Sequence, residues 1–69
     1  MRHTQANLER AKRHIVDAEK RVVKQRLLVD ELEREGHRST EAHEMLQVMV
    51  DLVSQLRAHA DEIAKDVRN

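Results

Sequence analysis

Apolar residues recur along the chain in two heptad rows, one on each side of its single glycine, Gly36. In both rows the spacing alternates between three and four residues, which is typical of helices that pack along one stripe. The first row is Leu8, Ala11, Ile15, Ala18, Val22, Gln25, Val29 and Leu32. The second row is Ala42, Leu46, Met49, Val53, Leu56, Ala60, Ile63 and Val67. We call these the seam residues, and they predict two long amphipathic helices.

A chain that turns back at Gly36 brings the two rows together in opposite directions. Pairing the rows in order places Leu8 opposite Val67 and Gln25 opposite Met49, and the residue numbers of each pair sum to 74 or 75. One register along the whole length is what an antiparallel helical hairpin requires. The same register places Glu19 beside Arg57 and Glu33 beside His43. The predicted fold is therefore all-α, an antiparallel two-helix hairpin.

Residues that cap helices stand at the expected ends. Thr4 or Asn7 can accept a hydrogen bond from a free amide of the first turn, and Ser39 or Thr40 can do so for the second helix. Gly36 suits the left-handed position that follows a helix. We expect helix 1 near residues 5–35, a turn at 36–39 and helix 2 near 40–67, all in a single domain, 1–69.

The apolar surface is wider than the seam. The stretch 45–53 is apolar on nearly every side, and an exposed patch of this kind usually marks an interface. Self-association of two hairpins into a four-helix bundle would cover it, and a helix of a different protein partner is the alternative. The predicted homodimer interface comprises Leu28, Met45, Val48, Met49, Val50, Leu52 and Val53, with Val16 and Val23 at its edges.

Charge is unevenly distributed along the expected hairpin. Its open end, residues 1–26 with 49–69, carries 11 basic and 7 acidic side chains, whereas residues 27–48 around the turn carry 2 basic and 6 acidic ones. The net charges are therefore +4 and −4. An antiparallel dimer would place each positive end over a negative turn, so we expect that orientation.

Gln25 interrupts the first row with a polar side chain. A polar residue at one seam position commonly fixes register or oligomeric state. In a two-fold dimer Gln25 could bond to its symmetry mate, or it could extend to the edge of the bundle. The sequence leaves both arrangements open.

Composition argues against catalysis and against a bound cofactor. The chain has 69 residues, no cysteine and no aromatic residue other than histidine. No serine, histidine and acid fall on one face, and the inward rows carry no carboxylate ligands. The register brings His14 and His59 close together, but two imidazoles lack the third ligand that zinc requires. We expect no enzyme activity, no cofactor and no metal.

Basic residues concentrate in the first helix and offer a second functional hypothesis. Arg10, Arg13, Lys20, Arg21 and Lys24 could contact phosphates, which would make the chain a small nucleic-acid-associated protein. The neutral net charge and the lack of aromatic residues to stack on bases count against this. No apolar run approaches the roughly 20 residues of a membrane span, so we expect no membrane association and a cytoplasmic location.

Several short segments resemble a group of short alphaproteobacterial proteins that are predicted to be helical hairpins. The segments are His14-Ile15-Val16, Val23-Lys24-Gln25-Arg26, Leu28-Val29, Gly36-His37, Thr40 and Ala42. The resemblance spans nearly the whole chain. It implies a bacterial cytoplasmic protein and no known activity, cofactor or functional residue.

Taken together, these patterns favour a non-enzymatic structural or regulatory module that acts through helix-mediated homodimerisation. The nucleic-acid hypothesis is the alternative.

Overall fold

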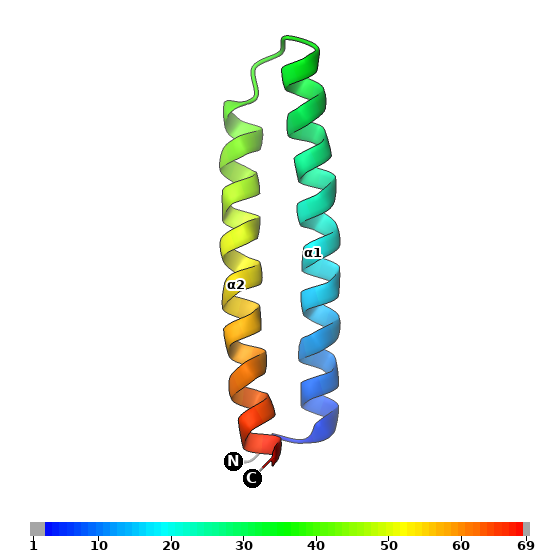
Figure 1. The fold of residues 1–69 in the computed structure, drawn as a ribbon, viewed down its shortest axis with the longest axis vertical. Helices are drawn as coiled ribbons and strands as arrows, with labels where there is room; N and C mark the ends of the chain where they lie inside the picture. The colour runs from blue at the N-terminus through cyan, green and yellow to red at the C-terminus, as the bar shows by residue number, and fades with distance from the viewer. Residues whose placement is uncertain (1–2, 69) are drawn as a thin grey trace.

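The computed structural model describes residues 3–68, which form two antiparallel helices joined by one turn (Figure 1). Helix α1 spans Gln5–Arg34 and helix α2 spans Thr40–Arg68, so each end lies within one residue of its predicted position. The hairpin is a narrow rod of 53 × 14 × 13 Å. The prediction of an all-α helical hairpin is confirmed.

Helix α1 begins with a side-chain cap from Thr4. Its hydroxyl oxygen Oγ1 accepts a hydrogen bond from the Asn7 backbone N–H at 3.2 Å. This satisfies one of the amides that a helix start leaves free. Before Thr4 the chain crosses towards α2 (Figure 1), where the His3 backbone N–H donates to the Asp66 carboxylate. This contact ties the segment before α1 to α2 at the open end of the hairpin.

The turn begins with a glycine-dependent helix end. Gly36 has a φ of 73°, the left-handed region that residues with a Cβ adopt at a cost. The His37 N–H donates to the Leu32 carbonyl at 2.9 Å, and the Gly36 N–H donates to the Glu33 carbonyl at 3.1 Å. These two bonds are the Schellman arrangement. The Ser39 carbonyl then accepts from the His43 N–H at 2.9 Å, which starts α2.

The seam residues form the core, as predicted. All of them are buried or half-buried. The most buried of them are Leu8, Ala18, Val29, Val53, Ala60 and Ile63. The heptad rows therefore identified the packed stripe of each helix correctly.

The register between the rows differs from the predicted one. Gln25 Nε2 donates to the Ala42 carbonyl at 2.9 Å. The predicted register would place Ala42 opposite Leu32, about 10 Å of helix away from Gln25 and roughly twice the reach of its side chain. Displacing α2 by one seam step places Gln25 opposite Leu46, one helical turn from Ala42.

In the displaced register the numbers of opposite residues sum to 71, which pairs Leu8 with Ile63 and Ala18 with Val53. Seam residues still face seam residues, except that Leu32 and Val67, at the ends of the rows, lose their seam partners. Figure 1 shows the cause, because α2 begins well below the level at which α1 ends. Part of the chain after Gly36 runs down beside α1 before α2 starts. The first residue of α2 therefore lies lower along α1 than the predicted register placed it.

Candidate interaction surfaces

The seam divides the surface of the hairpin into two flanking faces. One face carries both predicted ion pairs: Arg57 Nη2 lies 2.6 Å from Glu19 Oε2, and His43 Nε2 lies 3.3 Å from Glu33 Oε1. We call it the ion-pair face. Residues one heptad away from these pairs, such as Arg26 and Val50, lie on the same side. The opposite flank carries His14 and His59, and we call it the histidine face.

Large apolar side chains are exposed on both faces. They range from 37% to 61% exposed and lie between residues 16 and 52. On the histidine face, by heptad spacing from His14 and His59, they are Leu28, Met45, Leu52 and the adjacent Val48. On the ion-pair face they are Val16, Val23 and Val50. The apolar surface beyond the seam is thus split between opposite sides of the rod.

Two of the residues predicted to form the dimer interface also pack in the core of the single hairpin. Met49 is half-buried and Val53 is only 9% exposed, because both lie in the seam against α1. Leu27, which the predicted interface does not include, is the most exposed large apolar residue of the described chain at 61%. It lies at the outward position of its heptad, opposite the seam, and an apolar side chain at such a position is the signal that the sequence offered.

A shallow groove crosses the middle of the ion-pair face. Its floor is apolar, with Val22 and Val53 from the seam and Val23 and Val50 beside them. The Glu19–Arg57 ion pair and Arg26 form its rim. A short apolar floor with a charged rim suits contact with another protein surface.

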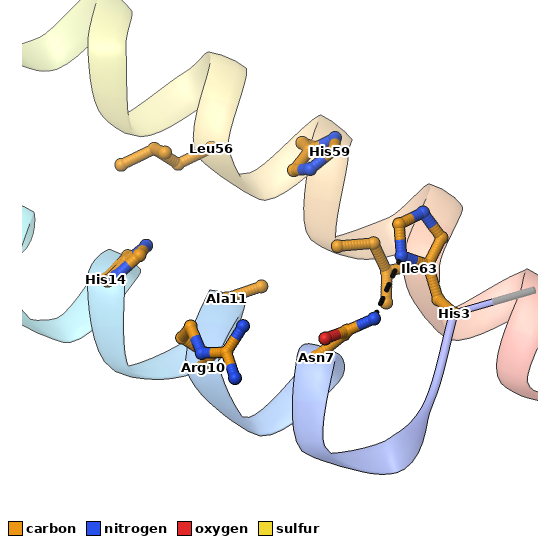
Figure 2. Close-up of a pocket in the computed structure, with 8 residues that line it drawn as sticks. All are labelled: His3, Asn7, Arg10, Ala11, His14, Leu56, His59 and Ile63. Carbon is orange, nitrogen blue, oxygen red and sulfur yellow. Dashed lines mark hydrogen bonds between the residues drawn. The ribbon is translucent and has the colours of Figure 1, made fainter.

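A second groove, of about 300 Å³, lies at the open end of the histidine face. Figure 2 shows its polar side chains arriving from three places: Asn7, Arg10 and His14 from α1, His59 from α2, and His3 from the chain before α1. The Asn7 amide nitrogen lies 3.4 Å from His3 Nδ1, and the His3 and His59 rings meet edge to face at 6.3 Å between centroids. The floor is Ala11, Leu56 and Ile63.

His14 and His59 therefore line one groove, but the residues described here contain no group of three or more metal-ligating side chains placed to hold an ion. His3 was not anticipated in this groove. Nothing in the heptad pattern fixes the path of residues that precede the first cap.

The predicted phosphate-contacting residues form an exposed row on α1. Arg10, Arg13, Lys20, Arg21 and Lys24 are all exposed, and their spacing places them on the outer side of the helix next to the histidine face. Asp17 interrupts the row. Within residues 3–68 none of the five takes part in an ion pair.

Comparison with known proteins gives no relative: no family model, curated protein or solved structure matches the chain. Neither helix in the described part of the chain combines the length and apolar character needed to cross a membrane.

Proposed function

We propose that the protein is a non-enzymatic structural or regulatory interaction module that works by self-association of two hairpins into a four-helix bundle. The observation that carries the proposal is the set of exposed apolar side chains in the middle of the rod. They are Val16, Val23, Leu27, Leu28, Met45, Val48, Val50 and Leu52. A surface of this kind in a small chain is typical of an interface.

The thin core of a single hairpin supports the same conclusion. Within residues 3–68 six apolar residues are buried, and four of them are the small residues Ala18, Val29, Val53 and Ala60, which remove little surface from water. Chains of this length usually need a further source of stability. Burying one Leu, Val or Met side chain contributes about 1.5–3 kcal/mol, so covering even one apolar face would add stability on the scale of a small domain.

Sedimentation equilibrium combined with thermal melting tests the proposal. We expect a species of twice the 8.1 kDa chain mass at micromolar concentration and a melting temperature that rises with protein concentration, because folding and association are then linked. A folded monomer at all concentrations, with a melting temperature independent of concentration, would contradict it.

The exposed basic row on α1 favours one second candidate, a nucleic-acid-associated protein. Five cations on one side of a helix can follow a phosphate backbone, and their affinity for generic duplex DNA should fall steeply with salt. A salt titration of binding separates the candidates. Indifference to DNA at low salt would remove the second one.

A further inference from the structure

We propose that the second copy docks antiparallel on the histidine face, so that the groove at each open end binds the carboxylates at the turn end of the other copy. This inference rests on the proposed self-association and specifies its face, its orientation and the ligand of the groove.

The polar lining of the groove is suited to anions. Arg10 contributes a guanidinium and Asn7 an amide, and each histidine can donate through a ring nitrogen. No carboxylate belongs to the lining. The Asp66 carboxylate, which contacts the segment that carries His3, accepts a hydrogen bond from the His3 backbone N–H. An incoming carboxylate would therefore meet donors on several sides above an apolar floor.

The turn end of the same face supplies carboxylates. Three exposed acids lie on the histidine side by heptad spacing from Arg10, Leu28 and Val48: Glu31 of α1, Glu35 directly after α1, and Glu41 of α2, respectively. Within residues 3–68 none of them forms an ion pair. A parallel dimer would gather these acids from both copies at one end, which is repulsive.

One row of α1 repeats with alternating charge in a way that selects the antiparallel arrangement. Heptad spacing aligns Arg10, Asp17, Lys24 and Glu31 on the edge of the histidine face. A two-fold axis beside residues 20 and 21 would place Arg10 against Glu31 of the second copy and Asp17 against its Lys24. Both cations of this row, Arg10 and Lys24, then meet an anion of the second copy. The same arrangement brings the two Arg21 side chains near each other, which is unfavourable.

The same axis passes through the apolar patch. In the observed register, residues 20 and 21 of α1 lie level with residues 50 and 51 of α2, between Val48 and Leu52. The axis that pairs the groove with the acids thus also brings the exposed apolar side chains of the two copies together. Hydrophobic contact at the centre and charged contact at both ends is the usual anatomy of an interface.

A matched pair of valines tests the choice of face. Val48 on the histidine face is 60% exposed and Val23 on the ion-pair face is 57% exposed, and the two lie in the same layer of the hairpin. We expect Val48→Asp to weaken the dimer by a factor of 100 or more, by analogy with charges placed in interface cores, and Val23→Asp to leave it nearly unchanged. The reverse result, measured by sedimentation, would overturn the inference.

Charge reversal tests the ligand of the groove. Arg10→Glu should weaken the dimer roughly tenfold, since the contact occurs twice, and adding Glu31→Arg should restore it. Lys12→Glu, on the ion-pair side of the same helix, is the control and should change little. Failure of the double variant to restore association would overturn the assignment of the groove.

Because the chain has no cysteine, a single introduced cysteine can be labelled and the orientation of the two copies measured directly. A spin label on Arg38→Cys, in the turn, should give a distance between the two copies of about 40 Å or more in the antiparallel dimer. A distance under about half of that would show the turns together and overturn the inference. A dimer that fails any of these tests leaves the proposed self-association standing, whereas a wild-type monomer removes both.

Discussion

Gly36 is the residue on which the helix end depends most directly. Its φ of 73° lies in the left-handed region, and a Cβ added there would meet nothing within 4 Å. The cost of a side chain is therefore a backbone cost alone. We expect Gly36→Ala to lower the free energy of unfolding by about 1–2 kcal/mol and Gly36→Asn by less, because Asn tolerates this region. Urea denaturation at one fixed protein concentration measures both, and equal stability of all three proteins would contradict the assignment.

At the scale of the helices, the hydrogen bond from Gln25 to Ala42 ties α1 to the first turn of α2. The Gln25 side chain is half-buried and donates across the hairpin, a contact that the heptad rows did not predict. The bond favours the observed register over the predicted one, in which the two seam rows also pair along their whole length.

Replacing Gln25 should therefore weaken the pairing of the helices. We expect Gln25→Ala to lower the free energy of unfolding by about 1–2 kcal/mol through loss of the bond and of half-buried contact. Gln47 is a matched control, because it is exposed and its amide donates only to Asp51 of its own helix. Gln47→Ala should change stability by less than about 0.5 kcal/mol, and equal losses in the two variants would argue against a cross-hairpin role for Gln25.

The two ion pairs contribute to orientation more than to stability. The Glu19 and Arg57 side chains are 45% and 59% exposed, and pairs of this kind contribute about 0–1 kcal/mol. They were anticipated from a register that is wrong by one step. The long side chains of these pairs can span one seam step along the helices. Their contacts therefore form in the observed register as well and do not distinguish it from the predicted one.

For the whole molecule, the stability of the hairpin is predicted to depend on its covering by a second copy. Leu52→Asp would place a charge within the exposed apolar patch, and we expect a monomer with much reduced helicity. Circular dichroism and sedimentation at matched concentrations measure both changes. Ala58→Asp adds the same charge to an exposed, outward position of α2 and should remain dimeric and helical. A helical Leu52→Asp dimer would show that this residue lies outside the interface.

The sequence by itself determined the two helices, their ends and the stripe that each buries. These features depend on local chemistry: Thr4 caps the amide of Asn7, Gly36 takes a left-handed φ, and seam spacing places one row on one side of a helix. Each can be judged within a few residues, so no knowledge of the partner helix was needed.

The tertiary structure decided the register, the position of His3 and the split of the apolar residues between two faces. A repeating row matches its partner nearly as well after a shift of one step, so hydrophobic pattern alone could not choose between sums of 74 and 71. The conformation of the turn and the Gln25 bond made that choice. The register also determines the groove at the open end of the histidine face, because its lining needs side chains of α1 and α2 at the same level along the rod.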